Sequence, residues 1–346
     1  MNGYTINKIK DSFWKVLVVI FGVAFIGFIV YYRLDQNTSK FKVYQNENTL
    51  IFIDKYVSKS DSSRFIAEWK AIINNFLTQA NFSETLKQKK ISYYPEVIFF
   101  VDNFYSVISL EDPYIEKYLK GRPGGDFQLL QKARLSVFFD SLISHSYTSN
   151  DGRYIFFSNA ENLEADLLYA YTHGIISYNM PESARKQLRV DSNWDFYAYT
   201  TWLLLEEMAA ISVQEMARAF KEGKTLDQAV AFIQNLPADY YTRADSPALK
   251  NEEEFIALSF REPDKTVSVY QACLEMAKHL ITQKGKEGFL TYLGNLFTGS
   301  YTTISELVQN DLQRYIDPIA NYYNTVKRAR SVEGQTSTAR PLPPSQ

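Results

Sequence analysis

Hydrophobic residues are concentrated in one uninterrupted run near the N-terminus, at 16–32, which reads VLVVIFGVAFIGFIVYY and carries no charge. A bilayer core of about 30 Å needs roughly 20 apolar residues in a helix, so this run lies at the short end of the spanning range. Trp14 and the pair Tyr31–Tyr32 flank it, where aromatic rings favour the lipid headgroups. The pattern predicts a transmembrane anchor over 13–32, preceded by a cytoplasmic stub over 1–12.

A cleaved signal peptide is the alternative for this N-terminal segment. Lys8, Lys10 and Lys15 would supply its positive region, but no small-residue cleavage pattern follows the apolar run. We therefore expect an anchor that stays uncleaved. Basic residues before and after the run are nearly balanced, and the leading lysines favour a cytoplasmic N-terminus. The expected product is a single-pass protein of a bacterial inner membrane, with its C-terminal domain in the periplasm or outside.

Beyond the anchor, a polar linker is expected over 33–48, and the spacing of apolar positions then alternates between strand and helix periods. Runs of β-branched and aromatic residues predict strands, and apolar positions three to four residues apart predict helices. The expected elements are strands at 49–57, 96–104 and 153–158, a helix at 62–79 capped by Ser62 or Ser63, and a long helix at 127–144.

From residue 162 onward, the pattern is helical almost to the end of the chain. The predicted helices are 162–179, 194–222, 226–234, 266–284, 286–297, 301–309 and 310–329. Residues 331–346 have almost no apolar content and are expected to form a disordered tail. We therefore predict a helix-dominated α+β fold, in which a small α/β lobe over 49–160 precedes a mostly helical lobe over 161–330.

Composition narrows the classes of function. The formal net charge is −2, and no basic patch indicates a nucleic-acid partner. Cys273 is the one cysteine, so an intramolecular disulfide is impossible, and its apolar neighbours favour a small buried side chain over a nucleophile. The chain has three histidines, His145, His173 and His279, which limits metal chemistry. The aromatic content suits a groove for a peptide or a glycan and equally suits the core of a helical domain.

One segment carries a candidate site. The predicted strand at 153–158 precedes LLYAYTHGIIS at 167–177, which contains His173, and WLLLEEMAA follows at 202–210, with Glu206 and Glu207. This order is similar to the gluzincin class of zinc metallopeptidases, in which an edge strand precedes a helix bearing H-E-x-x-H and a second helix supplies a glutamate ligand. The resemblance implies a metallopeptidase-like fold over roughly 49–310.

Carried over residue by residue, the resemblance is incomplete. His173 matches the first zinc ligand and Glu206 matches the third. Gly174 stands where the family has its general base, and Ser177 stands where the family has its second histidine. The base polarises the metal-bound water, and histidines four residues apart bind one zinc ion from one helix face. Glu207, directly after Glu206, is the fifth residue of this incomplete candidate site, with His173, Gly174, Ser177 and Glu206.

Three interpretations follow from these residues. The preferred one is an inactive metallopeptidase-like module with no cofactor, which is anchored in the membrane by 16–32 and binds a protein or peptide. The second is an active metal hydrolase, in which His173, Glu206 and a residue from elsewhere hold zinc. The third discards the resemblance: His173 is a buried core residue, Glu206 and Glu207 have structural roles, and the protein acts by association alone.

Overall fold

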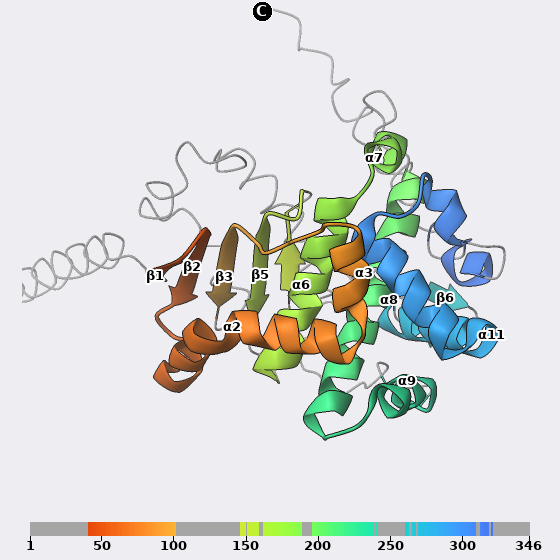
Figure 1. Cartoon of the computed structure of the whole chain (residues 1–346). Coiled ribbons are helices and arrows are strands. Elements are labelled where there is room, and N and C mark those ends of the chain that lie inside the picture. The colour runs from red at the N-terminus through yellow and green to blue at the C-terminus, as the bar shows by residue number, and fades with distance from the viewer. Residues whose placement is uncertain are drawn as a thin grey trace, which may run out of the picture.

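The computed structural model describes residues 41–101, 146–149, 151–158, 162–188, 196–237, 240, 260–262, 265–267, 269–308, 312–317 and 320. The fold of these residues is α+β and dominated by helices, with a sheet at one side of the molecule and the helical lobe at the other (Figure 1). The strands are β1 (Phe41–Asn46), β2 (Thr49–Asp54), β3 (Val97–Val101), β4 (Ser146–Thr148), β5 (Tyr154–Ser158), β6 (Phe260–Glu262) and β7 (Lys265–Val267). The helices are α2 (Lys59–Gln79), α3 (Phe82–Gln88), α6 (Leu163–Asn179), α7 (Glu182–Leu188), α8 (Phe196–Lys221), α9 (Leu226–Gln234) and α11 (Val269–Thr298).

The main sheet has the strand order β1-β2-β3-β5-β4. Its centre, β2-β3-β5, is parallel, and an antiparallel strand closes each edge. Parallel strands are buried on both faces and read as continuous apolar runs, which is why the sequence pattern located all three. The prediction of a linker over 33–48 is wrong in its second half. Residues 41–46 form the strand β1, which pairs with β2.

One face of the sheet supports the helical core. Ile51, Ile98 and Ile155, from the three parallel strands, belong to one buried cluster with residues of α2, α6 and α8. The other face carries a ladder of phenylalanine rings: Phe52 and Phe99 stack with centroids 4.8 Å apart, and Phe99 and Phe156 with centroids 4.4 Å apart. Side chains alternate across a strand, so neighbouring residues serve the two faces.

Helix α2 begins three residues earlier than the sequence pattern indicated. Ser58, rather than Ser62 or Ser63, is its N-cap, and the Ser58 side chain accepts a hydrogen bond from the Asp61 amide at 3.0 Å. Ser62 is buried and Ser63 is exposed within the first turns. The short turn after β2 decides which serine meets the free amides at the helix start.

Replacing Ser58 by alanine is expected to lower the free energy of unfolding by about 1 kcal/mol, because one amide of the first turn of α2 loses its acceptor. Ser63→Ala is the matched control and should change stability by less than about 0.5 kcal/mol, as surface substitutions usually do. Urea unfolding followed by tryptophan fluorescence measures both. An equal loss in the two variants would contradict the observed cap.

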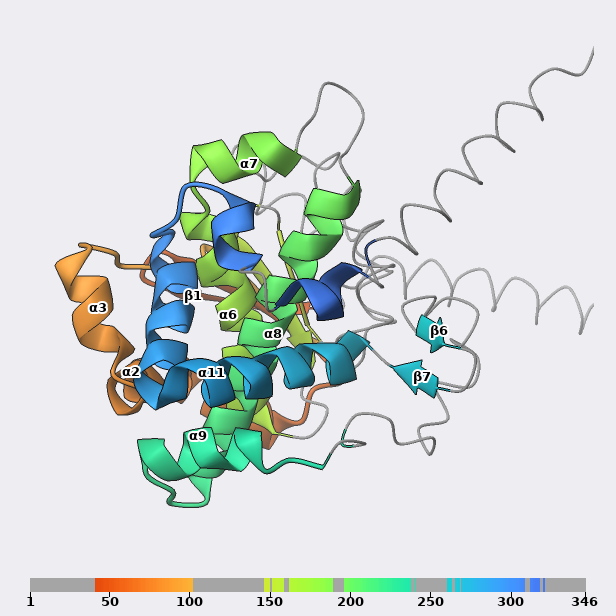
Figure 2. The same ribbon diagram turned by 90° about the vertical axis from the view of Figure 1, so that its right-hand side faces the viewer.

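The helical lobe is built around α8. Helix α6 packs along α8, and α11 packs on α8 and α9 (Figure 2). Helix α11 contains a break at Gly285, whose φ of 65° and ψ of −179° lie outside the helical region, which confirms the predicted boundary between 266–284 and 286–297. The helix predicted at 266–284 begins later than expected, at Val269, because residues 265–267 form β7.

Other predicted elements have mixed outcomes. Helices at 162–179, 194–222 and 226–234 are confirmed within two residues by α6, α8 and α9. Within the described residues, 304–308 and 312–317 are the helical parts of 301–309 and 310–329. The sequence pattern missed α3, α7, β4 and β6, which are short elements.

No helix in the described part of the chain combines the length and apolarity that crossing a membrane requires. The predicted anchor over 13–32, the stub over 1–12, the helix at 127–144 and the tail over 331–346 lie outside that part. These four expectations therefore stay predictions.

Candidate functional site

The structure brings His173 of α6 against Glu206 and Glu207 of α8. His173 Nδ1 lies 3.7 Å from Glu206 Oε1, and His173 Nε2 lies 3.4 Å from Glu207 Oε2. The three residues are 9%, 4% and 9% exposed, in that order. The imidazole ring therefore stands between two buried carboxylates, one at each ring nitrogen.

Two hydroxyl groups on α6 complete the arrangement. Ser177 Oγ donates a hydrogen bond to Glu206 Oε1 at 2.7 Å. The Tyr169 hydroxyl donates to Glu207 Oε1, and its ring meets the His173 ring edge to face with centroids 4.9 Å apart. Positions 169, 173 and 177 are four residues apart and share one helix face. We call these five residues, Tyr169, His173, Ser177, Glu206 and Glu207, the His173 cluster.

The electrostatics of the cluster favour a charged imidazole. Burial lowers the pKa of His173, but the contacts with Glu206 and Glu207 outweigh burial and raise this pKa to about 10. Burial, with a contribution from Glu207, raises the pKa of the Tyr169 hydroxyl well above its ordinary value, so Tyr169 stays a neutral donor. The charged imidazole then lies between the two carboxyl groups.

Gly174 points away from the cluster, toward the sheet. A Cβ built on Gly174 would lie 2.1 Å from the Tyr93 hydroxyl oxygen and 3.0 Å from Ile155 Cγ2. Tyr93 is itself held by a hydrogen bond from its hydroxyl to the carbonyl of Gly152 at 2.6 Å. The glutamate that the zinc peptidases carry at this position has no space here. Four of the five candidate residues therefore meet, and Gly174 is a packing residue.

The donor set does not fit a zinc ion. Zinc ligands converge within about 2 Å of one point, whereas Glu206 and Glu207 lie at opposite edges of the imidazole. An ion at either ring nitrogen would meet His173 and one carboxylate. The hydroxyl of Ser177 is hydrogen-bonded to Glu206. Across the described ranges, no three His, Cys, Asp or Glu side chains form a group suited to a metal ion.

The surroundings of the cluster bear on the resemblance in two ways. The strand before α6 is not at the edge of the sheet, because the three-residue β4 pairs with the outer side of β5. Glu206 does face His173, as the spacing of the family motif implies. The position of Tyr169 was missed, although its spacing of four residues before His173 could have indicated it.

Cys273 of α11 lies near the same region of α8. It is fully buried, and its thiol donates to the Leu204 carbonyl at 3.5 Å. Burial, with a smaller effect of Glu207, raises the pKa of this thiol well above its ordinary value. A thiol of raised pKa is a poor nucleophile, and the predicted buried side chain is confirmed.

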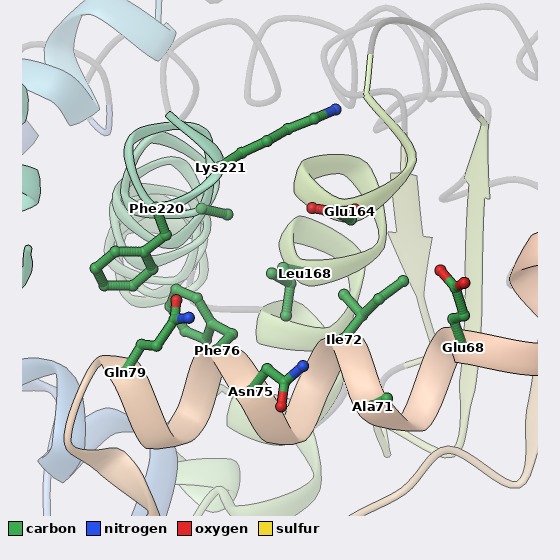
Figure 3. A pocket seen from close by; sticks show the side chains of 11 residues that line it. Glu68, Ala71, Ile72, Asn75, Phe76, Gln79, Glu164, Leu168, Phe220 and Lys221 are labelled. Atoms are coloured by element: carbon green, nitrogen blue, oxygen red, sulfur yellow. The ribbon is translucent and has the colours of Figure 1, made fainter. Parts of the chain in front are cut away.

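An open pocket of about 280 Å³ lies elsewhere, between α2, α6 and the end of α8 (Figure 3). Its floor is apolar and includes Ile72, Phe76 and Leu168, and Glu164 and Lys221 lie at its rim. No member of the His173 cluster lines this pocket. This pocket is therefore separate from the cluster, whose histidine and two glutamates are each less than a tenth exposed.

Comparison of the chain with protein-family models, with curated proteins and with solved structures found no match.

Proposed function

We propose that this protein is a membrane-anchored, extracytoplasmic binding module, in which a metallopeptidase-like arrangement of helices serves association with a protein or peptide instead of hydrolysis. The anchor is the predicted span at 16–32. The partner is bound by the folded domain that follows it. The membrane location and the peptidase-like origin both rest on the sequence pattern.

The closed His173 cluster is the observation that supports a non-catalytic role. A hydrolytic site needs an open position for water and substrate and a base that can take a proton. Here, Ser177 is bonded to Glu206, both edges of the His173 ring face carboxylates, and Gly174 has no room for a base. Each position that the resemblance assigns to chemistry is occupied by packing or by an internal contact.

The alternative is an active metal hydrolase with unusual ligands. Its support is the distance of 3.7 Å between His173 Nδ1 and Glu206 Oε1, which places the two candidate ligands side by side. It requires a third ligand that the described residues do not provide.

Zinc content separates the two functions. The full-length chain, purified in detergent without a histidine tag, is expected to contain far less than one zinc ion per chain by elemental mass spectrometry. It is also expected not to cleave a casein substrate, before or after incubation with zinc chloride. His173→Ala and the control His279→Ala should leave the zinc content unchanged. One zinc ion per chain that is lost only in His173→Ala would establish the alternative and refute our proposal.

A further inference from the structure

The two carboxylates of the His173 cluster need compensation for their burial. Glu206 and Glu207 are consecutive residues of α8, and both are buried. Burying an ionised carboxylate costs several kcal/mol unless a cation or several hydrogen bonds compensate for the lost water. The groups in contact with the two carboxylates decide how this cost is met.

The hydroxyl partners are neutral. Glu206 accepts from Ser177, and Glu207 accepts from Tyr169. Within the described ranges, no lysine or arginine forms an ion pair with either carboxylate, although Arg185 lies close enough to donate to the Ser177 carbonyl. The ring of His173 is the cationic group in contact with both.

We infer that the imidazolium of His173 is a built-in cation, which takes the place of a metal ion between Glu206 and Glu207 and couples α6 to α8. The geometry carries this inference: each ring nitrogen faces one carboxylate, at 3.7 Å and 3.4 Å. Both distances exceed a normal hydrogen bond, so the attraction is mainly ionic. Tyr169 and Ser177 then orient the carboxylates from the same face of α6.

This inference goes beyond the proposed function. It concerns how His173 holds α6 against α8, and it does not depend on whether the protein is a binding module. The groups around the ring are Tyr169 on α6 and the two glutamates on α8, with Ser177 of α6 bonded to Glu206. Tyr270 on α11 interacts with Tyr169, and Arg185 of α7 lies near Tyr301. Cys273 on α11 and Tyr301 lie near the carboxylates, and both remain neutral, since burial raises the pKa of each.

Charge removal provides the test. His173→Gln keeps a polar side chain of similar size but leaves two buried carboxylates without a cation. In the full-length chain in detergent, we expect the thermal midpoint to fall by roughly 10 °C. Adding Glu207→Gln to His173→Gln removes one of the uncompensated charges and should recover at least half of that fall. Adding Glu206→Gln should do the same.

Recovery of stability in the two double variants decides whether the inference holds. If the single variant does not fold, recovery is read as the return of soluble, monodisperse protein in the double variants. If neither Glu207→Gln nor Glu206→Gln recovers His173→Gln in either measurement, the imidazole is a packing group and the inference is wrong. The matched control combines His279→Gln on α11 with Glu84→Gln on α3, where Glu84 pairs with Lys87, and the two effects should add because the residues lie on different helices. Zinc content of the wild-type chain tests the proposed function separately.

Discussion

Gly174→Ala is expected to lower the free energy of unfolding by roughly 3 kcal/mol, the upper end of the usual cost of overpacking a core. The added Cβ would lie 2.1 Å from the Tyr93 hydroxyl, which no relaxed structure tolerates. Tyr93 cannot easily withdraw, because it is buried and donates to Gly152. Equilibrium urea unfolding, monitored by circular dichroism, measures the loss.

Two controls make this result specific. Gly294→Ala, also within a helix, places its Cβ 3.6 Å from Thr85 Cγ2, an ordinary contact, and should be neutral or stabilising by up to about 1 kcal/mol. Tyr93→Phe removes the closest atom and should make the cost of Gly174→Ala smaller in the double variant than in the single one. Wild-type stability in Gly174→Ala would show that α6 does not pack against Tyr93 as described.

The same contact bears on function. Rebuilding the family motif with Gly174→Glu and Ser177→His would place a longer side chain against Tyr93 and remove the hydrogen bond to Glu206. We expect loss of folded protein rather than gain of peptidase activity. Restoring the family motif alone is therefore not expected to produce a peptidase site in this fold.

The second large effect is a loss of stability at alkaline pH that depends on His173. Its pKa is about 10 in the folded protein, against about 6.5 in an unfolded chain. The folded state therefore binds this proton more tightly, so the contribution is complete below pH 6.5, decreases as pH rises toward 10, and is lost above it. The slope is about 1.4 kcal/mol per pH unit, and the total is roughly 5 kcal/mol.

The measurement is urea unfolding between pH 6 and pH 10.5 on the wild type and on His173→Gln. The stability difference between the two should shrink steadily across this window, while His279→Gln should follow the wild type. A difference that stays constant with pH would mean that His173 carries no extra proton in the folded state. A difference that disappears already near pH 6.5 would mean that the glutamates do not hold the proton.

Local patterns in the sequence were sufficient for most of the regular elements. The buried parallel strands β2, β3 and β5 are short apolar runs, and α6, α8 and α9 have helical periodicity. Local patterns failed where contact with a neighbouring strand decides the conformation. Residues 41–46, FKVYQN, are polar enough to resemble a linker, and they form a strand because β2 offers them a partner. The start of α2 was misplaced because several serines nearby can cap a helix.

The sequence by itself determined that the described chain is a helix-dominated α+β protein, since the periods of helices and strands are local properties. That His173, Ser177 and Glu206 share one site was an expectation from the resemblance to the zinc peptidases. Tertiary structure alone decided what this site is. Adjacent residues on a helix point about 100° apart, so only packing of α8 on α6 could bring Glu207 to the second ring nitrogen. Likewise, only the contact with Tyr93, distant in sequence, shows that Gly174 is a glycine because no side chain fits there.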